Sequence, residues 1–594
     1  MNIMALNKPS LNMYDLPMGA SLNDDGTCTF KVWAPNADSV TVVGSFNNWG
    51  KRKPKKLMQE QGYWYGKLDN LAEGDEYLYQ IKSGKNTFTR IDPYARSVTN
   101  SSGNGIIYKD NFEWQEEHYH LPAHNSLVIY ELHVGSYAMT KDGVPGTFGD
   151  LIEKLDYLSQ LGVNVVQIMP VAEFAGDLSW GYNPANIFAI ESAYGGPDAF
   201  KRFVKAAHDC GIGVVLDVVF NHFGPSDLAL WQFDGWSENG KGGIYFYNDH
   251  RSETPWGDTR PDYGRKEVQD FILDNVRMWL EEYHVDGLRL DMTVFMRTIN
   301  GNAFDDGDVI SEGWDMCRRI NDLAHTINPN VLMISEDLQG DAAITLGTQD
   351  GGAGFNAQWD KNFVHPVRSL LLEANDADRD LSALESALLS EYNGNPFSRI
   401  VYTESHDEVA NGKQRVPSEI DDEGLNYFAI KRAVLGSCLT LTSAGIPMIF
   451  QGQEFLQRGW FKDSASLDWS QAESYGGILQ LHKDLIAKRL DLYNEGDALT
   501  GKNTEVLVLD HEARILAVSR HADGRDSFIA VFNFGNNTVY DYPVPMHNIR
   551  ENAQLVFNSD ARIYCDDFGD VGHGYISEGQ IITTIGAYAC LLFK

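Results

Sequence analysis

The sequence is poor in cysteine: its 594 residues include six, at positions 28, 210, 317, 438, 565 and 590. No pair of them has the C-x-x-C spacing that is typical of redox motifs and zinc sites. Such scattered cysteines favour reduced, mostly buried thiols over a disulfide framework. The spacing therefore argues against a thiol-redox activity and against a structural zinc site.

Basic residues and long apolar runs are scarce as well. The chain has 48 Lys and Arg against 83 Asp and Glu, a formal net charge of −35. Because nucleic acids and anionic membranes are bound through basic patches, we expect neither as a partner. No apolar run approaches the roughly 20 residues of a membrane-spanning helix, and residues 1–17 lack the apolar core of a signal peptide. These absences predict a cytoplasmic protein with a neutral or small substrate.

Three stretches of different pattern divide the chain. Residues 1–120 and residues 496–594 contain short runs rich in β-branched and aromatic residues, separated by turn residues, so we expect a β-sandwich in each. The expected N-terminal strands are 28–33, 39–46, 62–68 and 76–81. The expected C-terminal strands are 515–519, 527–534, 554–558 and 587–593, without a long helix between them.

Residues 121–495 instead alternate short apolar runs with amphipathic helices such as 265–283, where apolar residues recur at helical spacing. Alternation of this kind implies a parallel sheet. The eight candidate strands are 127–132, 163–170, 213–219, 287–292, 331–337, 357–360, 399–406 and 447–451. Eight such units predict a (β/α)8 barrel. The expected fold class is therefore α/β, a TIM barrel flanked by an N-terminal and a C-terminal β-sandwich.

Polar residues follow four of these runs at the point where each strand ends. In VDGLRLDM, Arg289 and Asp291 would share one face of a strand, and a buried charged pair is costly unless it is paired or used. The other segments are DVVFNH (217–222), ISED (334–337) and SHDE (405–408). Taken singly, each segment is as consistent with a structural salt bridge or a loop cap. Because the active site of such a barrel lies at the carboxyl ends of its strands, the four together predict one site.

Carboxylates, histidines and one arginine dominate these segments, and the chain has no G-x-S-x-G motif and no phosphate-binding glycine loop. A carboxylate-rich cleft in a protein with a neutral substrate suggests glycoside chemistry. This chemistry needs one ionised carboxylate and one protonated acid beside an acetal carbon. A separation of about 5–5.5 Å between the two would retain configuration through a covalent intermediate.

The same four segments resemble, in order and spacing, the signature regions of glycoside hydrolase family 13, the α-amylase family, and WGYNP (180–184) resembles a fifth region. Within that family the chain is most similar to 1,4-α-glucan branching enzymes, through VIYELHVGSY (128–137), SHDEVANGK (405–413) and GQEF (452–455). The segment FKVWAPNADSVTVVGSFNNW (30–49) resembles carbohydrate-binding module family 48. For that module, Trp33, Trp49 and Trp64 are candidate glucan platforms, with packing favoured for Trp33.

The resemblance implies catalytic roles for three carboxylates. Asp291 would be the nucleophile, with Arg289 beside it lowering its pKa and fixing its orientation. Glu336 would act first as general acid and then as base, which requires a raised pKa. Asp407 would bind sugar hydroxyls and favour the distorted transition state.

The resemblance also implies sugar-binding residues around these carboxylates. His222 and His406 would donate hydrogen bonds to hydroxyls of the same sugar. Tyr182 would stack on that sugar, and Trp180 belongs to the same segment. Asp217 would support the site by holding the strand ends together. Each histidine could instead be a satisfied core residue, and Tyr182 a packed loop aromatic.

No metal or other cofactor is expected to be required. Asn221 corresponds to a calcium ligand of many α-amylases, but calcium needs roughly six to eight oxygen ligands, and the sequence does not identify the others. Branching enzymes commonly lack this ion. Calcium is therefore not predicted.

Three functions stay open. The first is a transferase that cuts an α-1,4 bond of glycogen, amylose, amylopectin or maltooligosaccharides and rejoins the fragment through an α-1,6 bond. The second is an α-glucan hydrolase of the amylase, debranching or trehalohydrolase type. The third is a glycan-binding protein with an inactive barrel. Departures from branching enzymes, at Met292 after the nucleophile, at Asp337 after Glu336 and at HFGPSD (222–227), keep the second function open.

Overall fold

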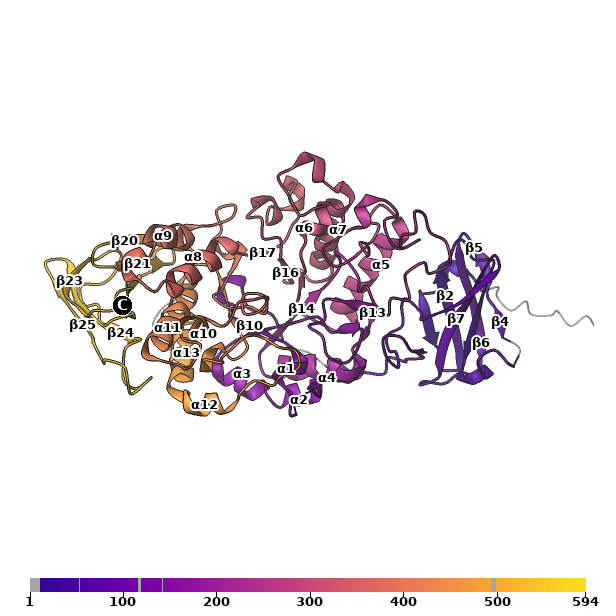
Figure 1. The fold of residues 1–594 in the computed structure, drawn as a ribbon, viewed down its shortest axis with the longest axis horizontal. Helices are drawn as coiled ribbons and strands as arrows, with labels where there is room; N and C mark the ends of the chain where they lie inside the picture. Colours follow the sequence, from indigo (N-terminus) through magenta and orange to yellow (C-terminus); the bar gives the residue numbers. More distant parts are fainter. Residues whose placement is uncertain (1–10, 53, 116–118, 142, 493–497) are drawn as a thin grey trace, which may run out of the picture.

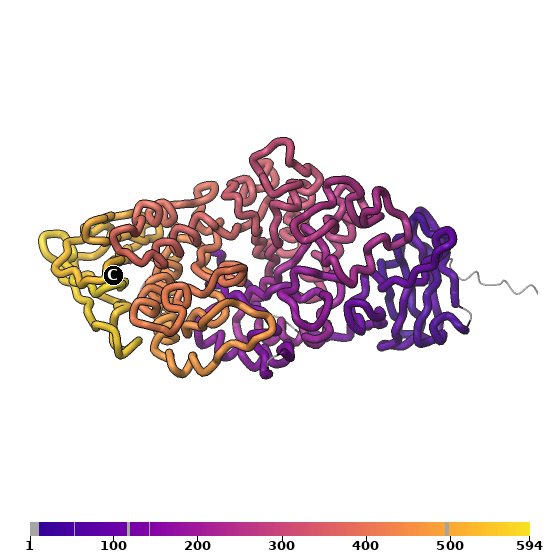
Figure 2. Tube along the Cα trace, in the orientation of Figure 1, coloured from indigo at the N-terminus to yellow at the C-terminus, as the bar shows by residue number. Residues whose placement is uncertain are grey.

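The computed structural model describes residues 11–52, 54–115, 119–141, 143–492 and 498–594. These residues form an elongated molecule with a β-domain at each end and a barrel between them (Figure 1). The N-terminal strands, in indigo, and the C-terminal strands, in yellow, lie at opposite ends of the long axis (Figure 2). The predicted fold class is confirmed, and the barrel is the part that positions the candidate site.

The N-terminal domain is a sandwich of two antiparallel sheets. One sheet has the order β1 (Gly19–Leu22), β2 (Thr27–Trp33), β6 (Tyr63–Asp69) and β5 (Met58–Glu60). The other has the order β4 (Lys55–Lys56), β3 (Ser39–Gly44), β7 (Glu76–Ser83) and β8 (Asn86–Arg90), and β9 (Gly105–Ile106) pairs with β7. Burial along β7 alternates with the period of a strand, so Tyr77 and Tyr79 point inward. Phe30 of β2 packs edge-on against Tyr77 across the sheets, with 5.4 Å between ring centroids.

Two of the three tryptophans proposed as glucan platforms are buried. Trp64 is 4% exposed, and its indole N–H donates to the carbonyl oxygen of Ala34 at 3.0 Å, so the platform prediction is wrong for this residue. Trp33 is 7% exposed and packs edge-on against Tyr245 of the barrel domain, which agrees with the packing role. Trp49 is 42% exposed and is the tryptophan of the three whose ring solvent can reach.

Eight parallel strands close the barrel, and every residue in them is buried. Continuous apolar runs of this kind are typical of strands that are covered on both faces. The sequence prediction of all eight is confirmed, although most strands are shorter than expected. The strands are β10 (Ile129–Leu132), β11 (Val165–Ile168), β14 (Gly213–Val218), β15 (Gly287–Leu290), β16 (Leu332–Ser335), β17 (Ala357–Trp359), β18 (Arg399–Val401) and β19 (Ile446–Phe450).

Helices surround the barrel and connect its strands. The expected helix 265–283 is α5 (Lys266–Arg277), continued by a π-helical turn, Met278–Glu282. An unpredicted hairpin, β12 (Ala172–Phe174) and β13 (Pro184–Ile190), follows β11, and the loop within it carries Trp180 and Tyr182. The other helices are α1 (Val134–Tyr137), α2 (Phe148–Ile152), α3 (Leu155–Leu161), α4 (Gly196–Asp209), α6 (Val294–Arg297), α7 (Ser311–Ile327), α8 (Lys361–Leu372), α9 (Leu381–Leu389), α10 (Val416–Ile420), α11 (Tyr427–Thr442), α12 (Ser470–Ser474) and α13 (Gly476–Arg489).

The C-terminal domain again consists of two antiparallel sheets. The five-stranded sheet has the order β20-β21-β22-β27-β24, and the three-stranded sheet has the order β23-β26-β25. Four strands were predicted: β21 (Ile515–His521), β22 (Phe528–Asn533), β24 (Leu555–Asn558) and β27 (Ala589–Phe593). Four were missed: β20 (Asn503–Asp510), β23 (Val539–Pro545), β25 (Gly572–Ser577) and β26 (Gln580–Ile585).

A buried ion pair fixes the C-terminal domain to the barrel domain. The ammonium group of Lys431, on α11, lies 2.6 Å from a carboxylate oxygen of Asp560, and the two residues are 0% and 2% exposed. The same carboxylate accepts the backbone N–H groups of Gly569 and Val571. The charges are therefore paired and hydrogen-bonded, as burial requires.

Two expectations about composition can be compared with this fold. All six cysteines are free thiols, as the spacing predicted. No helix in the described ranges has both the length and the apolar character that a membrane crossing demands.

Candidate active site

The site residues meet because three neighbouring strands end at the same edge of the barrel. The register aligns Asp217 of β14 with Arg289 of β15. It also aligns Leu290 with Ser335 of β16. Asp291 directly follows the last residue of β15, and Glu336 directly follows the last residue of β16. Strand order alone therefore brings four of the predicted residues together.

Arg289 lies at the centre of three carboxylates and is 0% exposed. Its Nη1 donates to Asp217 at 2.6 Å and to Asp291 at 3.1 Å. Its Nη2 forms an ion pair of 2.6 Å with Oε2 of Glu336. The guanidinium also lies over the ring of Trp359, 4.4 Å from the centroid. One cation is thus shared by three buried carboxyl groups, which it holds at fixed positions.

Arg289 lowers the pKa of Asp291, as predicted, but it does not set the net direction of the shift. Burial, followed by the carboxylate of Glu336, raises the pKa of Asp291 well above its ordinary value, and Arg289 only opposes this rise. Burial likewise raises the pKa of Asp217 to about 6 against the effect of Arg289. Since like charges in one buried pocket resist joint ionisation, this cluster retains a proton. Cleavage with Asp291 as nucleophile requires this proton to lie on another carboxyl group of the cluster.

Two further contacts hold Asp291 in place. Asn221 donates from its side-chain amide to Oδ2 of Asp291 at 3.1 Å. Met292, the next residue, has φ of 35°, which is unusual for a residue with a side chain. Its backbone N–H donates to Oε2 of Glu336 at 3.0 Å. The turn after Asp291 is therefore bound directly to the second carboxylate.

Asn221 matches a calcium ligand of many α-amylases in the sequence, and in the structure its side chain contacts Asp291 and His222. Its amide nitrogen donates a hydrogen bond to Asp291, and its Oδ1 lies 3.0 Å from Nδ1 of His222. Among the described residues, no group of three or more His, Cys, Asp or Glu side chains could hold a metal ion.

His406 is bound by a carboxylate that sequence reasoning missed. Its Nδ1 lies 2.7 Å from Glu131 of β10, and its backbone N–H donates to the same carboxylate at 3.1 Å. Its Nε2 lies 3.5 Å from Asp407, whose side chain is 42% exposed at the rim of the site. Burial alone would lower the pKa of His406, but Asp407 and Glu131 outweigh it and raise the pKa to about 9. The ring is therefore a cation at neutral pH.

This raised pKa predicts a pH-dependent stability. A group whose pKa is higher in the folded state stabilises the fold below its ordinary pKa of 6.5, and that contribution is lost as the pH rises through about 9. We expect the free energy of unfolding to fall by about 3 kcal/mol across this range because of His406. Urea denaturation at several pH values measures the effect, and His406→Gln should remove it.

The control for this prediction is His482→Gln. His482 is buried too, but burial lowers its pKa to about 4, so it does not titrate between neutral and alkaline pH. This variant should keep the wild-type pH dependence. Equal slopes for wild type and His406→Gln would contradict the prediction.

Aromatic side chains form one wall of the site. Tyr182 stacks on the ring of His406, with 5.0 Å between centroids, and its hydroxyl donates to Asp217 at 2.6 Å. Trp180 stands edge-on to His406 at 5.8 Å. Trp256, which was not singled out from the sequence, stacks on His222 at 4.6 Å and is 37% exposed.

His222 has protein partners at both ring nitrogens. Its Nδ1 lies 3.0 Å from Oδ1 of Asn221, and its Nε2 lies 2.9 Å from the carbonyl oxygen of Tyr182. Burial lowers its pKa to about 4, so the ring is neutral and carries one N–H. The predicted hydrogen bond from His222 to a sugar therefore requires a sugar hydroxyl to replace or share one of these acceptors.

The fold and this carboxylate cluster define a class of enzyme. A family profile described as the alpha amylase catalytic domain matches residues 94–251 and 228–477. A profile of carbohydrate-binding module 48, the isoamylase N-terminal domain, matches residues 17–95. The chain belongs to the α-amylase family of enzymes, glycoside hydrolase family 13, so the resemblance inferred from the sequence is confirmed.

Similar proteins fall into two groups. The chain is 30% identical to the 1,4-alpha-glucan branching enzyme GlgB of Oceanobacillus iheyensis, over 93% of this chain and 88% of that protein. It is 31% identical to GlgB of Methylococcus capsulatus, over 90% of this chain and 74% of that protein. Among solved structures, a pullulanase from Anoxybacillus sp. LM18-11 has a TM-score of 0.76 at 21% identity, covering 97% of this chain and 87% of its own. The catalytic module of the pneumococcal virulence factor SpuA has a TM-score of 0.75 at 20% identity, covering 98% of this chain and 97% of its own. The likeness to these two structures shows the fold.

Proposed function

We propose that this enzyme cleaves α-1,4-glucosidic bonds through a covalent glucosyl-enzyme and transfers the released chain segment to a 6-hydroxyl, which makes α-1,6 branches. The observation that carries the proposal is the pairing of Asp291 with Glu336 around one buried guanidinium. It places side by side the two carboxyl groups on which a retaining mechanism depends. The branching outcome is supported by the relatives named as branching enzymes, which match over most of the chain.

In the first half-reaction, an oxygen of Asp291 attacks the anomeric carbon while Glu336 gives its proton to the leaving glycosidic oxygen. Oε2 of Glu336 is occupied by the N–H of Met292 and by Arg289, so we assign the transferred proton to Oε1. The cationic ring of His406 and the carboxylate of Asp407 would bind hydroxyls of the same sugar. Their charges suit both the donor and the acceptor roles of a hydroxyl group.

In the second half-reaction, Glu336 acts as base. It takes the proton from the 6-hydroxyl of an acceptor chain, and that oxygen displaces Asp291 from the anomeric carbon. Two displacements at one carbon retain its configuration.

We propose glycogen, amylose, amylopectin and maltooligosaccharides as substrates. The domain division into residues 1–120, 121–495 and 496–594, and the cytoplasmic location, stay predictions.

Hydrolysis is the alternative, and it differs only in the group that attacks the glucosyl-enzyme. Water would replace the 6-hydroxyl, and Glu336 would remain the base. The segment HFGPSD (222–227), which is closer to trehalohydrolases, favours this alternative. The inactive-barrel hypothesis predicts glucan binding without turnover, so one assay separates all three functions.

The assay is incubation of the enzyme with amylose, followed by proton NMR for α-1,6 linkages and a reducing-end measurement on the same samples. We expect α-1,6 signals to grow with few new reducing ends. Asp291→Asn is the control and should produce neither signal. Reducing ends without α-1,6 linkages would overturn the proposal in favour of hydrolysis, and an unchanged substrate would favour an inactive barrel.

A further inference from the structure

Glu131 is a buried carboxylate that the proposed mechanism does not use. It lies on β10 and is 0% exposed. Both of its carboxylate oxygens contact His406, which lies 275 positions further along the chain. Because a charge inside a protein is tolerated only when it is paired and hydrogen-bonded, this contact accounts for the presence of a carboxylate among the apolar residues of β10.

The contact joins the two residues at two points. Oε1 of Glu131 lies 2.7 Å from Nδ1 of the His406 ring. Oε2 accepts the backbone N–H of His406 at 3.1 Å. Since a carboxylate accepts hydrogen bonds, Nδ1 must carry a proton to make the shorter contact. The side chain of Glu131 therefore fixes both the backbone of His406 and the protonation of one of its two ring nitrogens.

Two aromatic rings restrict the orientation of the His406 ring. Tyr182 stacks on it, with 5.0 Å between centroids and 20° between the ring planes. Trp359 packs against it at 5.8 Å and 56°. With Nδ1 bound to Glu131, Nε2 faces Asp407, whose carboxylate lies 3.5 Å away. The ring thus has a carboxylate at each nitrogen, an arrangement that favours the form with a proton on both.

Charges from several elements act on the His406 ring. Burial lowers the pKa of His406, and the guanidinium of Arg289 lowers it further. Asp407 and Glu131 outweigh both effects and raise this pKa to about 9. Burial lowers the pKa of His133 to about 4, so that ring stays neutral and adds no charge. The titratable groups that interact with the ring are Glu131 and His133 of the β10 segment, Tyr182 of the β12–β13 loop, Asp217 of β14, Arg289 of β15 and Asp407.

We propose that Glu131 is a positioning residue, which holds His406 as a doubly protonated ring with its Nε2–H available to a hydroxyl group of the sugar that is cleaved. The contact of His406 with the sugar rests on the proposed function. Glu131 acts through His406 and not on the sugar itself. The N–H group of a cation is a stronger donor than a neutral one, and hydrogen bonds to sugar hydroxyls strengthen in the transition state of glycoside cleavage. Loss of Glu131 should therefore lower kcat more than it raises KM.

The test is the ratio of kcat on amylose between Glu131→Gln and wild type, measured from about pH 5 to about pH 8. Glutamine keeps the shape of the side chain but removes its charge, so the pKa of His406 should fall and the ring should lose its proton within this range. Because both enzymes share the catalytic carboxyl groups, the ionisation of those groups cancels in the ratio. We expect the ratio to fall by about 10–100-fold as the pH rises, the effect of losing a hydrogen bond to a charged group.

A purely structural role for Glu131 predicts the same ratio at every pH, and that result would overturn the proposal. The variant Glu131→Asp keeps the test decisive if Glu131→Gln does not fold. Its shorter side chain withdraws the carboxylate from Nδ1, so its ratio to wild type should fall in the same direction by a smaller factor. A constant ratio would again contradict the proposal. In a His406→Gln background, Glu131→Gln should add no pH dependence of its own.

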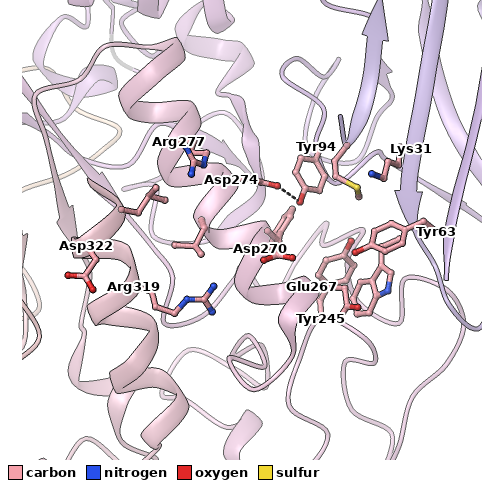
Figure 3. A pocket seen from close by; sticks show the side chains of 15 residues that line it. Lys31, Tyr63, Tyr94, Tyr245, Glu267, Asp270, Asp274, Arg277, Arg319 and Asp322 are labelled. Carbon is pink, nitrogen blue, oxygen red and sulfur yellow. Dashed lines mark hydrogen bonds between the residues drawn. The ribbon is translucent and has the colours of Figure 1, made fainter. Parts of the chain in front are cut away.

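Two carboxylates away from the site supply the controls. Asp286 also pairs with a histidine, His208, at 2.9 Å and accepts the backbone N–H of Val214 at 2.7 Å, but it precedes the amino end of β15. Asp274 accepts a hydrogen bond from Tyr94 at 3.1 Å, beside a cavity that none of the proposed catalytic residues lines (Figure 3). Asp286→Asn and Asp274→Asn should each give a ratio that is constant with pH. A pH-dependent ratio in either control would overturn the specific role of Glu131.

A measurement without turnover separates this inference from the proposed function. In an Asp291→Asn background, which prevents turnover, the His406 ring is titrated by NMR and identified as the signal that His406→Gln lacks. Glu131→Gln should lower the pH at which this ring titrates by about 1–2 pH units, and an unchanged titration would overturn the proposal. Failure of the proposed function gives a different result: amylose acquires no α-1,6 linkages while the titration still differs between the two proteins.

Discussion

Asp291→Asn should lower kcat on amylose by about 10⁴-fold or more, the scale of loss when a nucleophile is removed from an enzyme that forms a covalent intermediate. An amide is too weak a nucleophile to displace the leaving chain. It still fills the space of the carboxylate and can keep the contacts with Asn221 and Arg289. We therefore expect the free energy of unfolding to stay equal or to rise, because burial penalises the ionised form of Asp291.

The control for this variant is Asp92→Asn. Asp92 lies in the N-terminal domain, is 0% exposed, and has a pKa that burial raises to about 6. It therefore matches Asp291 in burial and in the direction of its pKa shift, but not in position. Its substitution should leave kcat unchanged. Residual activity of Asp291→Asn within about 100-fold of wild type would contradict the assigned nucleophile.

Arg289→Lys should cost both turnover and stability. A lysine ammonium is a point charge and cannot reach the three carboxylates that the guanidinium fork contacts. The carboxylates would then repel one another and shift their shared proton. We expect kcat to fall by about 10²–10³-fold and the free energy of unfolding to fall by about 2–3 kcal/mol, as when buried polar groups lose their partners. Steady-state kinetics and urea denaturation measure the two effects.

Arg399→Lys separates these two effects. Arg399 is also 0% exposed on a barrel strand, and it pairs with Asp360 at 3.0 Å and with backbone carbonyl groups. Its substitution should cost similar stability without lowering kcat. If both variants lose turnover to the same degree, Arg289 has no special role in positioning the carboxylates.

The barrel was predictable because its strands are buried over their whole length, so each is a short, mainly apolar run in the sequence, interrupted in several strands by one polar or charged residue. In the missed strands β20 and β25 every residue is at least partly exposed, and β25 (GHGYIS) has little apolar sequence, although β20 contains the apolar run VLVL (506–509). The β12–β13 hairpin was missed for another reason. Its first strand has three residues, too few for a periodic signal.

The core of the site was predictable because neighbouring parallel strands end at one edge, so polar residues at the ends of β14, β15 and β16 had to meet. Contacts between distant segments were not predictable. Glu131 and His406 are 275 residues apart in the chain. The only sequence signal for Glu131 was that it is a charged residue inside the apolar run LVIYEL.

The net direction of the pKa shift of Asp291 was not predictable for the same reason. The sequence places Arg289 two residues before Asp291, and an adjacent cation lowers the pKa of a carboxyl group. It does not show the depth of burial or that Glu336 lies against Asp291. Both of these effects raise the pKa, and together they exceed the effect of the arginine.

The Lys431–Asp560 pair has a consequence for how this chain can be recombined. Exchanging the C-terminal strands for others that cover α11 without a carboxylate in the place of Asp560 would leave the ammonium group of Lys431, which is 0% exposed, without its counter-ion. An uncompensated buried charge costs several kcal/mol, a large part of the total stability of a typical domain. A transplant that exchanges the barrel or the C-terminal sheets alone must therefore replace both members of this pair.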